Sequence, residues 1–96
     1  MIRHVLFVKL KDRSPAHCEK VRELFLSMEG KVPCIRAIEA GVDFLHSERS
    51  YDVCLYVTLD NPAALDEYQA DPYHCDVVKR YIADAKEASV AVDYEV

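Results

Sequence analysis

The sequence contains no cluster of positive charge. Its 96 residues include 12 lysines and arginines against 17 aspartates and glutamates, which gives a formal net charge of −5. No run of basic residues is longer than two. Nucleic acid and anionic membranes are bound through basic patches that neutralise phosphates. We therefore expect neither nucleic acid nor a membrane as a partner.

Long apolar runs are also missing. No stretch approaches the roughly 20 apolar residues that a membrane-spanning helix needs. The N-terminal segment MIRHVLFVKLK is interrupted by His4 and Lys9 and has no small-residue cleavage site, so it favours a β-strand over a secretory signal. We expect a cytoplasmic location.

Closely spaced cysteines are absent as well. The four cysteines, Cys18, Cys34, Cys54 and Cys75, include no C-x-x-C pair, and we predict free thiols, with Cys18 and Cys54 acting as small buried hydrophobic residues. Structural zinc is usually held by ligand pairs two to four residues apart, whereas the nearest Cys and His neighbours here are adjacent. No metal is predicted.

The residues that are present fit one small domain spanning 1–96. Hydrophobic residues make up 51% of the chain and charged residues 30%, which suffices for a core with little surplus. Alternating and helical spacing of apolar residues predicts, in order, a strand at 2–10, a helix from the Ser14 cap to Gly30, a strand at 35–45 with a bulge at Gly41, a strand at 51–59, helices at 62–71 and 72–85, and a strand at 88–96.

This β-α-β-β-α-β order, with its second helix broken in two, predicts an α+β, ferredoxin-like protomer. Its four-stranded antiparallel sheet would carry helices on one face. The opposite face is also apolar, with Val5 and Phe7 on the first strand and Cys54 and Tyr56 on the third. Because a second sheet is the simplest cover for such a face, we expect a homodimer.

The break in the second helix separates two groups able to handle protons. Asp71 precedes Pro72, so it is biased away from helical geometry and free to cap the next helix. Tyr68 lies before the break and His74 just after it. Burial and the positive end of the helix dipole favour a neutral His74 with a pKa below the ordinary value, whereas the Asp71 carboxylate would oppose that shift.

If the bend turns both side chains toward the sheet, they would line one cavity with His4 and the apolar Leu6, Val8 and Val57. Polar groups within an apolar cavity are typical of a small-molecule site. The alternative is structural, since buried histidines and tyrosines commonly have their polar atoms satisfied by backbone or water. We expect His17 and His46 to be exposed, and the acidic cluster at 66, 67 and 71 to be a solvated helix face.

Several segments, taken together, resemble the stress-responsive dimeric α/β barrel family, known as Dabb. They are IRHVLFVKLK, VPCI followed by a glycine in the next strand, YDVCLYVTL, YQADPYH and VDYEV, and they span the whole chain in order. The resemblance implies a ferredoxin-like protomer whose sheet packs against that of a second protomer to form a dimeric α/β barrel.

At three positions the chain is similar to plant olivetolic acid cyclase, a cofactor-free member of that family that closes a polyketide ring by aldol condensation. The resemblance implies that His74 abstracts a proton next to a carbonyl, that Tyr68 donates a hydrogen bond to the carbonyl oxygen, and that no cofactor is used. Where the cyclase has a histidine before the proline, this chain has Asp71. The residues expected to bind the substrate are His4, Leu6, Val8, Phe25, Val57 and Tyr81.

Two classes of function remain open from the sequence. The first is a cofactor-independent enzyme acting on a small carbonyl compound, such as a cyclase, an isomerase or a monooxygenase-like catalyst. The second is a non-enzymatic, stress-related or ligand-binding dimer.

Overall fold

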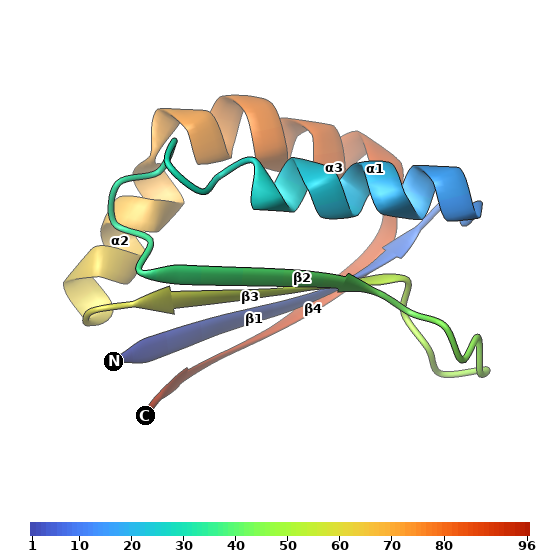
Figure 1. Cartoon of the computed structure of the whole chain (residues 1–96), viewed down its shortest axis with the longest axis horizontal. Coiled ribbons are helices and arrows are strands. Elements are labelled where there is room, and N and C mark those ends of the chain that lie inside the picture. Colours follow the sequence, from blue (N-terminus) through green and yellow to red (C-terminus); the bar gives the residue numbers. More distant parts are fainter.

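The computed structural model describes all 96 residues. Its elements are β1 (Ile2–Leu10), α1 (Pro15–Leu26), β2 (Ala37–Val42), β3 (Val53–Leu59), α2 (Pro62–Ala70), a π-helical turn (His74–Lys79), α3 (Arg80–Ala85) and β4 (Lys86–Glu95). The four strands form one antiparallel sheet in the order β2-β3-β1-β4. The helices all cover the same face of that sheet (Figure 1), as the ferredoxin-like prediction requires. No helix in the chain is both long enough and apolar enough to cross a membrane.

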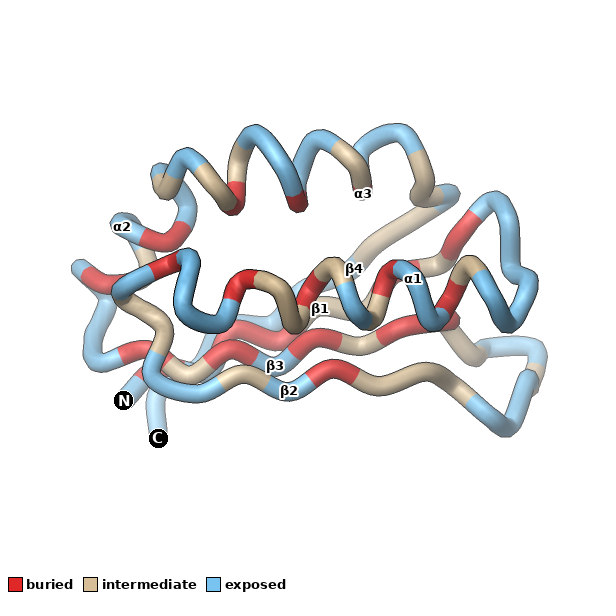
Figure 2. Tube along the Cα trace, turned by 45° about the horizontal axis from the view of Figure 1, so that its top comes forward, coloured by how far each residue is buried: buried red, intermediate tan, exposed pale blue.

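The hydrophobic core lies between the sheet and the helices, where the buried residues gather (Figure 2). Alternate residues of β3 point into it, and Val53, Leu55, Val57 and Leu59 are all buried. Helix α1 contributes Cys18, Val21 and Phe25, which follow helical spacing. The inward alternation of the strands therefore fixes which residues can lie beneath the helices.

A buried carboxylate joins the end of β1 to the start of β3. Asp52 is 3% exposed, accepts a hydrogen bond from the Leu10 backbone N–H at 2.8 Å, and pairs with the Arg13 Nε at 3.0 Å. A buried charge of this kind is tolerated because it is both paired and hydrogen-bonded. This contact secures the chain where it leaves the sheet to enter α1.

The predicted break in the second helix is confirmed at Asp71. Helix α2 ends at Ala70, and the Asp71 backbone is extended, with φ −62° and ψ 131°. Its side chain accepts a hydrogen bond from the His74 backbone N–H at 3.1 Å, so it caps the next helical segment. That segment runs from Pro72 to Ala85, and its central turn is π-helical, which the sequence did not reveal.

The π turn changes which side chains the segment buries. The sequence predicts Val77, Val78, Tyr81 and Ile82 as its apolar side, but Val77 is 41% exposed. Val78 and Ile82 are buried as predicted, and His74, four residues before Val78, is the third buried residue of the segment. The wider i→i+5 winding of a π turn shifts residues around the helix axis, and Val77 lies within this turn.

Three further boundaries differ from the prediction. Helix α1 ends at Leu26 instead of continuing to Gly30. Strand β2 stops at Val42 because the Asp43 carboxylate accepts the His46 backbone N–H at 2.7 Å and closes a turn, and the bulge predicted at Gly41 is absent from the regular β2-β3 register. A Cβ at position 41 would lie 3.4 Å from the Cys54 sulfur, so the glycine makes room for that side chain.

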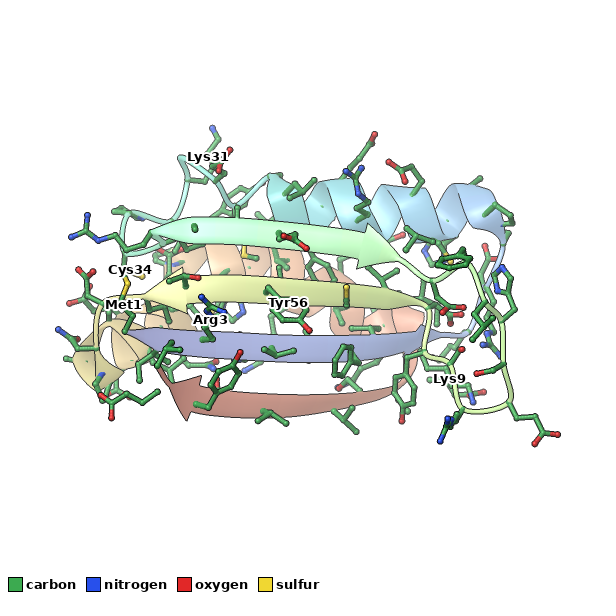
Figure 3. All side chains as sticks on the ribbon, turned by 60° about the horizontal axis from the view of Figure 1, so that its bottom comes forward. Met1, Arg3, Lys9, Lys31, Cys34 and Tyr56 are labelled. Carbon is green, nitrogen blue, oxygen red and sulfur yellow. The ribbon has the colours of Figure 1, made fainter.

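The sheet face opposite the helices is uncovered (Figure 3). It exposes a group of apolar and aromatic side chains, among which Val92 is 58% exposed, Val90 49% and Tyr94 40%, with Tyr56 at 37%. Single exposed apolar residues are ordinary, but a contiguous apolar sheet face is typical of an interaction surface. We call the side chains of Tyr56, Val90, Val92 and Tyr94 the open sheet face.

Candidate functional site

A cavity of about 220 Å³ lies between the helix-covered side of the sheet and the segment 72–85. It is smaller than the roughly 300–1,000 Å³ of pockets for drug-sized ligands, so it suits a small molecule. Strands β1 and β3 form its floor and the segment 72–85 much of its wall. Its lining residues are His4, Leu6, Phe25, Leu55, Tyr68, Gln69, His74, Val78, Lys79, Ile82, Ala83, Lys86 and Ser89.

Three aromatic rings lie close together along one side of this cavity, tilted against one another. The Tyr68 ring lies between those of His4 and His74, with centroid distances of 5.4 Å and 4.3 Å. These residues come from β1, the last turn of α2 and the π turn, so the break at Asp71 brings the rings of Tyr68 and His74 together, with an angle of 33° between their planes. The predicted grouping of these three residues is present in the structure.

His4 is held by a carboxylate from the neighbouring strand. Its Nδ1 lies 2.5 Å from Asp93 Oδ1, because β1 and β4 pair with His4 directly opposite Asp93. A carboxylate that accepts the Nδ1 hydrogen fixes the orientation of the ring. Sequence reasoning missed Asp93, although the closing VDYEV segment was recognised as a strand.

His74 lies in an environment that opposes positive charge. It is 8% exposed, and burial lowers the pKa of its imidazole below 6.5, with further contributions from Lys79 and His4. The Asp71 carboxylate raises the pKa of His74, but its effect is the smallest of the four causes. Its side chain accepts a hydrogen bond from the His74 backbone N–H and not from the ring. The Nδ1 atom is enclosed and has no hydrogen-bond partner.

The Tyr68 hydroxyl is also buried. It donates to the Met28 sulfur at 3.8 Å, and the residue is 1% exposed. Burial raises the pKa of the phenol far above its ordinary value, so the group stays protonated and available as a donor. Thioether sulfur is a weak acceptor, and this contact is therefore easily exchanged for a stronger oxygen acceptor.

Three residues expected to bind a ligand do not line the cavity. Val8 and Val57 are completely buried in the core, beneath other side chains. Tyr81 turns toward α1, where its hydroxyl lies 2.9 Å from Nε2 of His17. That contact also corrects the prediction of an exposed His17, whose side chain is only 14% exposed.

The remaining predicted residues, His4, Leu6, Phe25, Tyr68 and His74, all line the cavity. The sequence did not point to Leu55, Val78 or Ile82, although the four-residue spacing of His74, Val78 and Ile82 was visible in it. It also gave no sign of the two lysines, Lys79 and Lys86, because their place on the cavity wall depends on the π turn and on the turn into β4.

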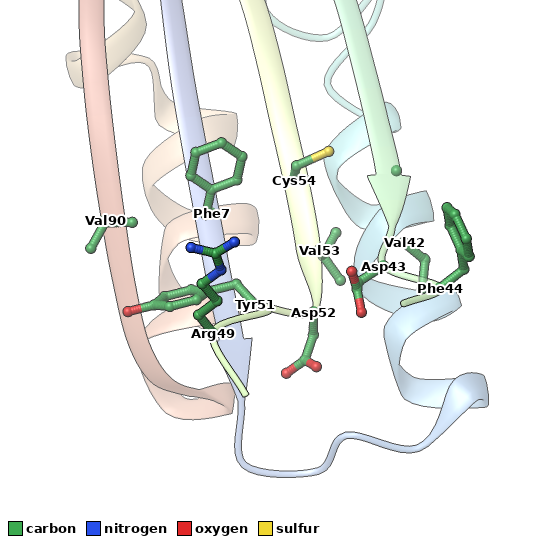
Figure 4. Close-up of a pocket in the computed structure, with 11 residues that line it drawn as sticks. Phe7, Val42, Asp43, Phe44, Arg49, Tyr51, Asp52, Val53, Cys54 and Val90 are labelled. Atoms are coloured by element: carbon green, nitrogen blue, oxygen red, sulfur yellow. The ribbon is translucent and has the colours of Figure 1, made fainter. Parts of the chain in front are cut away.

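A larger hollow of about 600 Å³ lies on the other side of the sheet (Figure 4). Phe7, Cys54 and Val90 form its floor, and the loop after β2 forms its rim. Cys54 is only half-buried there, instead of buried as predicted. The carboxylate of Asp52 is already paired with Arg13, so this hollow carries little chemistry of its own and belongs with the open sheet face.

No group of three or more His, Cys, Asp or Glu side chains is arranged to hold a metal ion. All four cysteines are free thiols, as predicted.

Comparison with known proteins identifies the family. Residues 2–96 match the family model of the stress responsive A/B barrel domain. The chain belongs to the Dabb family. No functionally curated protein matches this Dabb protein at a significant level.

Solved structures share the fold over nearly the whole chain. A dimeric ferredoxin-like protein of unknown function from Bacteroides fragilis is 27% identical, with a TM-score of 0.83 over 99% of this chain and 95% of that one. A protein from Arabidopsis thaliana is 21% identical, with a TM-score of 0.85 over 100% and 95% of the two chains. A hydroxynitrile lyase from Passiflora edulis is 16% identical, with a TM-score of 0.82 over 99% and 92%.

The environment of His74 leads to a test by NMR. Of the four histidines, His74 should titrate below 6.5, because burial, Lys79 and His4 oppose its protonation. The unfolded chain then binds a proton that the native protein does not, so stability should fall as the pH drops below about 6.5. His74→Gln should reduce this loss, because it removes the group whose protonation the fold opposes. A His74 titrating at or above 6.5 would contradict this description of the site.

Proposed function

We propose that this Dabb protein binds a small, mostly apolar carbonyl compound in the cavity beside His4, Tyr68 and His74, and that His74 removes a proton next to the carbonyl group. The observation that carries the proposal is a neutral imidazole at the wall of an apolar cavity, whose enclosed Nδ1 leaves Nε2, which makes no hydrogen bond to the protein, as the nitrogen able to accept a proton. A base of this kind can accept a proton near neutral pH.

In the proposed step, His74 takes the proton and the electrons of the broken C–H bond move onto the carbonyl oxygen. The enolate oxygen then needs a donor. The Tyr68 hydroxyl can supply one by leaving the Met28 sulfur, and its raised pKa keeps it protonated. His4, oriented by Asp93, also lies beside the Tyr68 ring and can hold a polar group of the ligand.

Ligand binding without catalysis is the second candidate. It is favoured by the enclosure of His74 Nδ1 and by the contact of the Tyr68 hydroxyl with Met28, since both polar atoms turn away from the cavity in this state. The hydroxynitrile lyase among the similar structures supports the enzymatic candidate to the extent that one protein of this fold is an enzyme.

Proton exchange with solvent can separate the two candidates. Phenylacetone in D₂O should lose its hydrogens next to the carbonyl faster with the protein than in buffer, and His74→Gln should slow the protein-dependent exchange by about 100-fold, which is typical of a lost general base. His46→Gln serves as the matched control. If phenylacetone binds but its hydrogens exchange no faster than in buffer, the enzymatic candidate is rejected and ligand binding without catalysis is supported.

We also propose that the open sheet face packs against the same face of a second copy. Its exposed apolar side chains support this, as does the dimeric state of the similar Bacteroides fragilis protein. A face-to-face dimer would cover the larger hollow of Figure 4 as well.

Light scattering at micromolar concentration should therefore give about twice the chain mass of 11.0 kDa. Val92→Asp, which places a charge in the proposed interface, should give monomers. Val77→Asp alters a comparably exposed valine on the helical side and should leave the dimer intact. A monomeric wild-type protein, or a dimer unaffected by Val92→Asp, would contradict this arrangement.

A further inference from the structure

The cavity has an unusual balance of charge for this chain. Acidic residues outnumber basic ones by 17 to 12 overall, yet the 13 residues that line the cavity include two lysines and no aspartate or glutamate. The adjacent carboxylates are already engaged, Asp93 by His4 and Glu87 by Lys9. The cavity therefore lacks an acidic partner for its two ammonium groups.

Lys86 is the more distinctive of the two lysines. It occupies the first position of β4, where the chain turns out of α3, and it is half-buried. Its only polar contact is with the Ser89 hydroxyl, at 3.4 Å. Every other lysine or arginine in the chain either is exposed or forms an ion pair with a carboxylate. A half-buried lysine without a carboxylate partner is a favourable place for an anion to bind.

Lys79 lies seven residues earlier on the same segment, and Ala83 lies between the two on the cavity wall. Lys79 is exposed and forms no ion pair, and it lies near enough to His74 to act on its charge. The lysines thus contribute positive charge to the cavity wall, whereas Leu6, Phe25 and Leu55 supply apolar surface.

We infer that the natural ligand is a small organic anion with an apolar body, and that Lys86, assisted by Lys79 and the Ser89 hydroxyl, binds its carboxylate. This inference rests on the proposed function, because it names the class of ligand for the same cavity. A carboxylate bound by Lys86 would orient the molecule and direct its remaining atoms toward the apolar wall and His74. The small volume of the cavity favours a single-ring or short-chain acid over a nucleotide.

Phenylacetate and phenylacetone form a matched pair of probes, because they differ mainly in a carboxylate oxygen against a methyl group. Binding can be followed by calorimetry and by NMR shifts of the Leu6 and Ile82 methyl groups. Wild-type protein should bind phenylacetate about tenfold more tightly than phenylacetone, as expected for one charge-assisted hydrogen bond.

Lys86→Met should remove that preference by weakening phenylacetate about tenfold while leaving phenylacetone unchanged. Lys86→Arg keeps the charge and should retain the preference, and Lys31→Met removes an exposed lysine from the turn after α1 and should change neither affinity. If phenylacetone binds but phenylacetate binds no more tightly, or if Lys86→Met has no effect, the inference is wrong and the proposed function stands. If neither probe binds at the cavity, both are wrong.

Discussion

The Asp71–Pro72 junction is the constraint on which the site depends. Proline cannot continue the hydrogen-bonding of α2, and the residue before it is driven to extended geometry, which Asp71 adopts. The freed Asp71 side chain then caps the backbone at His74. Two helical segments meet at an angle as a result. The residues on either side of the junction are Tyr68 and His74, and their ring centroids lie 4.3 Å apart. An unbroken helix would place side chains six positions apart on different faces.

The environment of these side chains follows from the same geometry. The segment after the junction covers the end of the sheet where His4 lies, so the rings of His4, Tyr68 and His74 lie together at the edge of an apolar core. Removal from water lowers the pKa of His74 and raises the pKa of Tyr68, because burial disfavours the charged form of each group. His74 is therefore kept neutral and Tyr68 protonated. A proton acceptor and a proton donor are thereby held side by side, and the lysines Lys79 and Lys86 add the only formal charge to the cavity wall.

Much of this arrangement could be predicted from the sequence because it depends on local chemistry. Alternating apolar residues indicated the strands, Ser14 and Pro62 marked helix starts, and Asp71-Pro72 marked the break. Features that depend on tertiary packing were not visible. The π turn and the exposure of Val77 within it have no simple local signal, and the cross-strand pair of His4 and Asp93 requires the register of β1 against β4. Val8 and Val57 share a sheet face with cavity residues, yet other side chains cover them, which alternation alone cannot reveal.

The central claim is that the helix break exists to position Tyr68 against His74, and Pro72→Ala tests it most directly. Proline at the first helical position gives up no needed N–H, so the substitution should change the free energy of unfolding by less than about 1 kcal/mol. Relaxing the junction should nevertheless weaken phenylacetone binding about tenfold, measured alongside urea unfolding on the same samples. A loss of stability with unchanged affinity in the folded protein would contradict the claim and make the break a feature of folding alone.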